Sequence, residues 1–216
     1  MMPEFPMLRR LARAPYAALS RVLKLHPALA FIEETKGHAV PITYDIWFRQ
    51  QILGVNRGPY WPVHPSSVVV GWRNILAGVD VSPGYMPGCY IQGLGRIEIG
   101  DYTRVSANVG IMSSNHDVYD LASHDHGVVK IGRYCWLSMG VLVMPGVTLG
   151  DFTIVGAGSV VTKSFPEGGC VIAGNPARVI KQLDRSRFVE RRNDREYHGY
   201  IRKEEFPTFR DAMLNV

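Results

Sequence analysis

The sequence of 216 residues lacks most of the motifs that assign a chemistry on sight. Its three cysteines, Cys89, Cys135 and Cys170, form no CxxC pair. This excludes CxxC-type zinc and redox sites, and the odd number favours a reducing compartment. The chain also has no GxxxxGK phosphate loop, no HExxH pair and no complete GxSxG turn. P-loop hydrolysis, HExxH metalloprotease chemistry and serine-triad hydrolysis are therefore set aside.

Long apolar runs are missing as well. No stretch approaches the ~18 apolar residues of a membrane-spanning helix, and the arginine-containing N-terminus lacks the apolar core and cleavage site of a secretory signal. The sequence therefore predicts a cytoplasmic protein. From Met7 to Phe31 the apolar residues partly follow helical spacing, broken at Pro15 and Pro27. This segment fits either a helix packed on its own domain or a partner subunit, or a basic helix on the inner face of an anionic membrane.

Composition and charge place the chain among globular proteins, with 46% apolar residues, 20% charged residues and a formal net charge of +5. The basic residues are spread over both ends rather than collected in one stripe. No nucleic-acid partner is therefore predicted, whereas small phosphorylated ligands suit this charge.

A period of six residues dominates the middle of the chain. In steps of six from Val63 and again from Ile131, thirteen of fifteen positions are Val, Ile or Leu. Glycine often follows these positions, where it lets the backbone turn a corner. Neither the alternation of an open sheet nor the 3.6-residue period of a helix fits. The pattern predicts a mainly β solenoid, in which each coil buries its apolar surface against the neighbouring coils.

The repeat divides the chain into three expected parts. Residues 1–62 are expected to form a helical segment, including a helix over residues 44–53. Residues 63–180 form the solenoid. Residues 181–216 form a helical tail, with a solvated helix expected from residue 181 to residue 205.

These hexads resemble those of the hexapeptide-repeat acyltransferases. The resemblance implies a left-handed parallel β-helix of about five coils with three hexads each, and a homotrimer with active sites between subunits. The stretch from Gly132 to Lys181 looks like the C-terminal signature of the galactoside, maltose and xenobiotic acetyltransferases. The implied reaction is acetyl transfer from acetyl-CoA, used as a co-substrate, with no metal expected.

The six-residue step is interrupted once by fourteen extra residues, which predicts a loop at residues 117–130 expelled from the coils. Asn115 and His116 stand at its root, and in the family a histidine there is the catalytic base. A neutral imidazole, with a pKa ordinarily ~6.5, can take the proton of an acceptor hydroxyl or amine as it attacks the thioester. The alternative interpretation is that His116 only caps a turn.

Three further residues near the loop have open roles. His124 and His126 can be solvated loop residues, acceptor contacts or metal ligands. Glu98 lies eighteen residues before His116, and Asp80 eighteen before Glu98, so an unbroken register would place all three at one corner of successive coils. Glu98 would then orient the imidazole or raise its basicity, or it is a solvated corner residue.

The cofactor residues follow from the same resemblance. They are Trp136 in the active site, Ala157 at the pantetheine arm, Thr162 and Lys163 beside the CoA chain, and Arg178 at its phosphates. Lys181 adds a third cation to Lys163 and Arg178, which suits a ligand with several phosphates. Cations after a last coil can equally serve only to cap it.

The acceptor of the acetyl group is predicted from a less specific resemblance. The runs PITYDIWFRQ, PYWPVHPSS and SPGYMPGCYIQG are similar to bacterial acetyltransferases of surface-polysaccharide synthesis. The leading hypothesis is O-acetylation of a sugar hydroxyl on a small sugar or glycan. An amino-sugar N-acetyltransferase and a chloramphenicol-type drug acetyltransferase use the same base and cofactor. Two alternatives from other classes are a γ-carbonic-anhydrase-like metalloenzyme and a non-catalytic scaffold. Metal analysis of the purified protein would test the first, and absence of CoA binding would favour the second.

Overall fold

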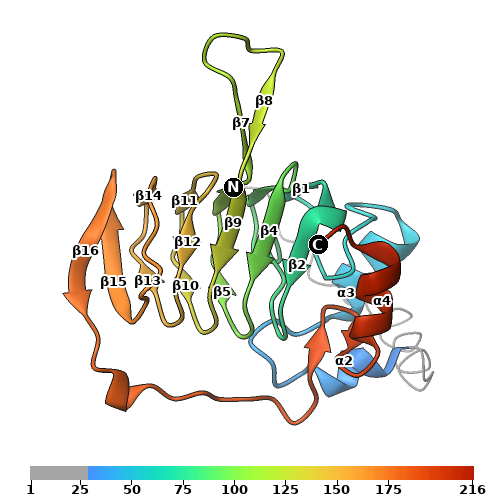
Figure 1. Ribbon diagram of the computed structural model, residues 1–216. Coiled ribbons are helices and arrows are strands. Elements are labelled where there is room, and N and C mark those ends of the chain that lie inside the picture. Colours follow the sequence, from blue (N-terminus) through green and yellow to red (C-terminus); the bar gives the residue numbers. More distant parts are fainter. Residues whose placement is uncertain (1–28) are drawn as a thin grey trace, which may run out of the picture.

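The computed structural model describes residues 29–216, so the expectations for residues 1–28, membrane contact included, lie outside the described part. The described chain is mainly β, and Figure 1 shows its coils stacked along one axis with a hairpin projecting from their side. Short helices and the C-terminal helix gather at the end of the stack where β1 and β2 lie. Among these residues no helix is both long and apolar enough to cross a membrane.

Three sheets form the coils, and the chain visits them in turn. Sheet A contains β1 (Val68–Val70), β3 (Tyr90–Gln92), β6 (Gly110–Met112), β11 (Leu142–Val143) and β14 (Val160–Val161). Sheet B contains β2 (Ile75–Ala77), β4 (Arg96–Ile99), β9 (Val128–Ile131) and β12 (Thr148–Leu149). Sheet C contains β5 (Arg104–Val105), β10 (Trp136–Leu137), β13 (Ile154–Val155), β15 (Cys170–Gly174) and β16 (Ala177–Gln182). All their pairings are parallel except the antiparallel pair of β15 with β16.

The spacing of stacked residues is regular only in the second half. There Val143 pairs with Val161, a spacing of 18 residues. In the first half Val69 pairs with Ile91, a spacing of 22, because extra residues lie between β2 and β3. Cys89 and Ile91 therefore fill the interior where the six-residue count from Val63 had placed Pro87 and Gly93, both of which break the pattern. The hexads predicted the type of structure correctly, but not this register.

The interior is a single column of aliphatic side chains. Ile97, Ile111, Leu137 and Val155 are fully buried, as are most of their equivalents in neighbouring coils. Burying each such side chain contributes about 1.5–3 kcal/mol, so the stack as a whole holds the fold. Because the strands have only two to six residues, no coil could bury its apolar face alone.

One corner of the coils carries a ladder of aromatic rings. Tyr102, Tyr134 and Phe152 occupy equivalent positions with positive φ, and their rings stack at 5.3 and 5.0 Å between centroids. Phe188 continues the stack on Phe152 at 4.2 Å. The ladder therefore joins the coils to the segment that follows them.

That C-terminal segment corrects a prediction. The helix expected over residues 181–205 is not formed. The segment instead contains the end of β16, a short 3₁₀ turn (Arg185–Arg187) and the strand pair β17 (Tyr197–His198) and β18 (Ile201–Arg202). The ladder holds it extended, because the Tyr134 hydroxyl donates to the carbonyl of Arg191 at 3.3 Å and the Tyr102 hydroxyl donates to Glu196 at 2.6 Å.

The C-terminal helix lies further along the chain, at α4 (Phe206–Met213). Phe206 and Phe209 there pack against Tyr60, with ring centroids 5.3 and 5.2 Å apart. Over residues 181–205 the chain is held instead by the contact of Phe188 with Phe152 and by the strand pair β17–β18, and these contacts keep it extended.

The N-terminal helices close the same end of the stack. They are α2 (Ala30–Glu34) and α3 (Tyr44–Trp47), which continues as a π-helical turn (Phe48–Ile52), as the helix expected over residues 44–53 predicts. Gln50 is fully buried within it and binds the backbone of Trp61 and Val63 as well as the hydroxyl of Tyr200. The run PYWPVHPSS is thus held as a structural cap on the first coil.

Candidate functional site

The interruption of the hexads is a β-hairpin. Strand β7 (Ser114–His116) pairs antiparallel with β8 (His124–His126), so that Ser114 faces His126 and His116 faces His124. The chain returns to the coils at Val128, because β9 pairs with β4 over four residues. The projecting segment therefore begins and ends about three residues earlier than the expected loop at residues 117–130.

His116 is exposed on this hairpin and has a fixed ring orientation. Its Nδ1 lies 2.7 Å from the carbonyl oxygen of Leu121. A carbonyl oxygen only accepts, so Nδ1 must carry the proton in this hydrogen bond. In the neutral ring the lone pair is then on Nε2, the form in which an imidazole can accept a proton from another molecule.

The other two loop histidines lie beside His116. The rings of His116 and His124 have centroids 4.3 Å apart, and those of His124 and His126 are 6.4 Å apart. Asn115 faces Asp125 across the hairpin, and both are exposed. Among the residues that the structure describes, no group of three or more His, Cys, Asp or Glu is arranged to hold a metal ion.

The hairpin tip carries a feature that the hexad analysis missed. Val118, Tyr119 and Leu121 are 82%, 96% and 72% exposed there. The sequence signal was present, since these apolar residues lie outside the repeat and have no core to enter. An exposed apolar tip is unusual on an isolated subunit and indicates a contact surface.

The expected corner of Asp80, Glu98 and His116 is not formed. In sheet B, Glu98 lies between Leu76 and Lys130 in the strand register, and it forms an ion pair with Arg96 at 2.6 Å. The residue count failed because the coils before Glu98 contain extra residues and because His116 has left the coils on the hairpin.

Asp80 belongs to a different group of side chains. It is buried and accepts from Arg104 at 3.0 Å, and His38 lies 3.8 Å away on the other side. Burial lowers the pKa of His38, although the charge of Asp80 opposes this effect. The group joins the N-terminal segment to the coils.

The six expected cofactor residues are all exposed and lie on two adjoining faces. Trp136 is on β10, 49% exposed, and its Nε1 donates to the hydroxyl of Ser106 at 3.1 Å. The others are Ala157 at the turn between β13 and β14, Thr162 and Lys163 just after β14, and Arg178 and Lys181 on β16. Among the described residues, no hydrogen bond or ion pair joins any of them to His116 within one chain.

The three cations among these residues are available to a ligand. Lys163 lies 5.9 Å from the ring of Phe165, and Arg178 donates to the carbonyl of Ala177 at 2.9 Å. Within residues 29–216, neither they nor Lys181 is paired with a carboxylate. Exposed, unpaired cations suit the phosphates of a nucleotide-like ligand.

The cysteines take no part in this chemistry. All three are free and buried. Burial raises the pKa of Cys135 to about 11 and raises that of Cys89 and Cys170 as well. The thiols are therefore protonated near neutral pH and pack as small apolar residues.

Comparison with known proteins agrees with this arrangement. The family described as "Bacterial transferase hexapeptide (six repeats)" matches residues 129–163. The putative colanic acid biosynthesis acetyltransferase WcaF of Escherichia coli K12 is 42% identical over 145 residues, covering 62% of this chain and 73% of that protein. The galactoside O-acetyltransferase of the same organism is 34% identical over 110 residues, about half the length of each chain. A crystal structure of a galactoside acetyltransferase in complex with coenzyme A is 28% identical, with a TM-score of 0.54 over 63% of this chain and 69% of that one.

The stacked parallel strands and the hairpin between them define a hexapeptide-repeat protein. With the match to WcaF covering most of that relative, the chain belongs to the hexapeptide-repeat acyltransferases, a family of enzymes. The family predicted from the hexads is thereby confirmed.

Proposed function

We propose that the chain is an acetyl-CoA-dependent O-acetyltransferase acting on a sugar hydroxyl, with His116 as the general base. The observation that carries this proposal is the bond from His116 Nδ1 to Leu121, which leaves Nε2 of the neutral ring as the acceptor on an exposed hairpin. The role of the base is to take the hydroxyl proton as the acceptor oxygen attacks. Asn115, beside it on β7, is assigned to positioning the acceptor.

Acetyl-CoA would supply the activated acetyl group as its thioester. We assign its pantetheine arm to the exposed turn at Ala157 and its phosphates to Lys163, Arg178 and Lys181. Trp136 and Thr162 complete the binding surface. The unpaired state of the three cations supports this assignment, because each loses no internal ion pair on binding a phosphate.

The coils are proposed to form a left-handed β-helix, and three chains are proposed to assemble as a homotrimer. Support comes from the outer face of sheet A, where Val68, Tyr90, Gly110, Leu142 and Val160 stand in one register row. Several of these side chains are about 40% exposed, which leaves an apolar stripe along the stack. In a trimer the hairpin tip would reach a neighbouring chain and bring His116 to that chain's cofactor surface.

The acceptor is proposed to be a sugar of a surface polysaccharide. Two relatives support this choice, one named a putative colanic acid biosynthesis acetyltransferase and the other a galactoside O-acetyltransferase. We assign the transferase to residues 63–180, with residues 29–62 and 181–216 as the cap and the C-terminal segment.

Release of CoA from acetyl-CoA over a panel of sugars, sugar nucleotides, glycan fragments, amino sugars and chloramphenicol tests the proposal. We expect release with the hydroxyl-bearing sugars, reduced about 100-fold or more in His116→Ala. His64→Ala is the matched control, because His64 lies on the cap and its imidazole bonds to the neighbouring Ser66. A protein that does not bind acetyl-CoA would contradict the proposal, and release confined to amino sugars or chloramphenicol would replace the acceptor class.

A further inference from the structure

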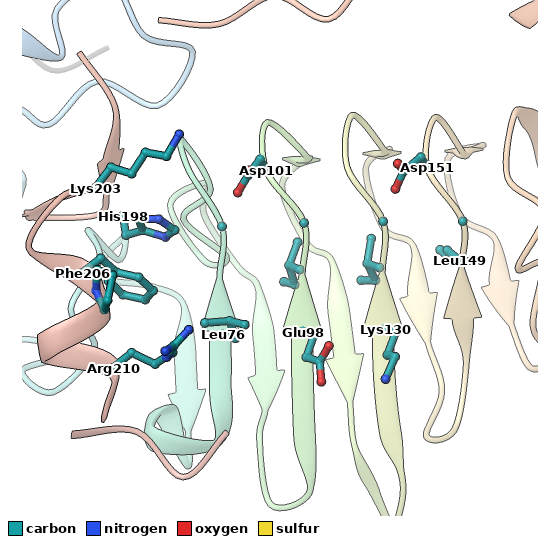
Figure 2. Close-up of a pocket in the computed structure, with 17 residues that line it drawn as sticks. Leu76, Glu98, Asp101, Lys130, Leu149, Asp151, His198, Lys203, Phe206 and Arg210 are labelled. Atoms are coloured by element: carbon teal, nitrogen blue, oxygen red, sulfur yellow. The ribbon is translucent and has the colours of Figure 1, made fainter. Parts of the chain in front are cut away.

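A groove crosses the outer face of sheet B, away from the hairpin and the proposed cofactor surface. It has a volume of about 590 Å³ and lies between the coils and α4. Figure 2 shows Phe206 and Arg210 of α4 on one side, with Leu76, Glu98 and Lys130 of three successive strands along the sheet. The volume falls in the range of about 300–1,000 Å³ typical of small-ligand sites.

The floor of the groove is set by glycines at the end of each strand. A Cβ on Gly100 would come within 2.7 Å of the backbone nitrogen of Arg133, and one on Gly132 within 2.5 Å of that of Asp151. These positions must therefore stay bare, which leaves a flat channel beside Leu76 and Phe206. The coils and α4 are packed, so the channel exists before any ligand binds.

The charges of the groove balance. Its lining includes three carboxylates, Glu98, Asp101 and Asp151, and three cations, Lys130, Lys203 and Arg210. His198 adds no charge near neutral pH, because burial lowers its pKa. A ligand of large net charge of either sign would meet as much repulsion as attraction there. Four of the six groups also have an ion-pair partner outside the groove: Glu98 pairs with Arg96, Asp151 with Arg133, Lys203 with Glu196 and Arg210 with Asp211.

We infer that this groove binds an oligosaccharide, as a second contact for the acceptor glycan outside the reaction site. Sugar hydroxyls donate to carboxylates and accept from ammonium and guanidinium groups, so one uncharged ligand satisfies both kinds of side chain. The apolar faces of the sugar rings fit the flat channel. The choice of a glycan rests on the proposed function, while the groove and its charge balance do not.

The position of the groove fits an acceptor of several units. Lys130 lies four residues after His126, where the hairpin ends. His116 lies two residues further along the hairpin than Ser114, the partner of His126. At 3.3 Å per extended residue, roughly 20 Å of chain separates the groove from the base. A monosaccharide reaches only one of the two sites, whereas a longer glycan can occupy both.

Methyl NMR of the full chain, without acetyl-CoA, tests the inference directly. The probes are neutral gluco- and galacto-oligosaccharides from the monosaccharide to the hexasaccharide, with inorganic phosphate as a charged comparison. We expect the methyl signals of Leu76, which is partly exposed in the groove, to shift with the oligosaccharides, and binding to tighten with length. Signals that stay still with every oligosaccharide at millimolar concentration, or that respond to phosphate instead, overturn it.

Two substitutions locate the binding. Lys130→Ala and Arg210→Ala are each expected to weaken it about tenfold, since each removes a charged hydrogen-bond donor. Lys36→Ala changes an exposed lysine just after α2, and this control is expected to keep the wild-type affinity. Unchanged affinity in both groove variants contradicts the inference. Because no acetyl transfer is measured, failure here is distinct from failure of the proposed function, which is read from CoA release.

Discussion

His116 and His198 both have Nδ1 bonded to a backbone carbonyl, yet their surroundings give them different properties. His116 is exposed on the hairpin, while His198 is stacked on Phe206 at 3.8 Å and bonded to Ala77 at 2.9 Å. Burial lowers the pKa of His198, and the bond to Ala77 only partly opposes this. One imidazole is therefore available to another molecule, and the other is a neutral part of the packing under α4.

The lowered pKa of His198 makes the free energy of unfolding depend on pH. In the unfolded chain the imidazole takes up a proton near its ordinary value of 6.5, whereas the folded chain holds it neutral to a lower pH. The unfolded state then binds more protons, so this contribution is complete above about pH 6.5 and is lost as the pH falls below it.

We expect the difference in unfolding free energy between wild type and His198→Gln to shrink as the pH falls from about 7.5 to about 5.5. Urea unfolding at several pH values measures it. His38, whose pKa burial also lowers, remains in both proteins and cancels in the comparison. A difference that is constant or grows over this range would contradict the assignment.

At the scale of single elements, the coil corners depend on glycines that leave no room for a side chain. Gly132→Ala would place a Cβ 2.5 Å from the backbone nitrogen of Asp151, which cannot move without disturbing the next coil. We expect a loss of about 1–3 kcal/mol in the free energy of unfolding. Gly37→Ala is the control, because nothing lies within 4 Å of its Cβ position. Equal midpoints of unfolding for the two variants would show that the corner is not close-packed.

Some of these elements could be predicted from the sequence and others could not, and the difference has physical reasons. From Ile131 onward the hexads stack at 18 residues, so the interior positions could be read directly. Before Arg96 the coils contain extra residues, which a fixed count cannot locate. The partner of Glu98 was missed for this reason. The extended C-terminal segment was missed because Tyr102 and Tyr134, which hold it, are distant in sequence.

The residues proposed for the site depend on the repeat and on the family resemblance. His116 was proposed because it stands where the hexads are interrupted, and the cofactor residues were proposed from the family resemblance. Its hydrogen bond to Leu121 depends on how the hairpin closes, and no local pattern in the sequence encodes that closure. The groove under α4 was not foreseen, because a helix remote in sequence forms one wall.

At the scale of the whole molecule, the apolar row on sheet A should decide the assembly. A lysine at Leu142 would place a charge in the middle of that row, and we expect Leu142→Lys to sediment as a monomer where the wild type sediments as a trimer. Ile180→Lys changes a more exposed apolar residue on β16 and should leave the trimer intact. A Leu142→Lys protein with the mass of the wild type would place the interface elsewhere.

Identification of the reaction product tests whether the chain is an O-acetyltransferase with His116 as its general base. Wild type and His116→Ala are incubated with acetyl-CoA and a surface-polysaccharide fragment, and the acceptor is analysed by mass spectrometry before and after mild alkali. We expect the wild type to add an acetyl group that alkali removes, as is typical of an ester, and His116→Ala to form this product about 100-fold or more slowly. An alkali-stable product, or equal rates for the two proteins, would contradict it.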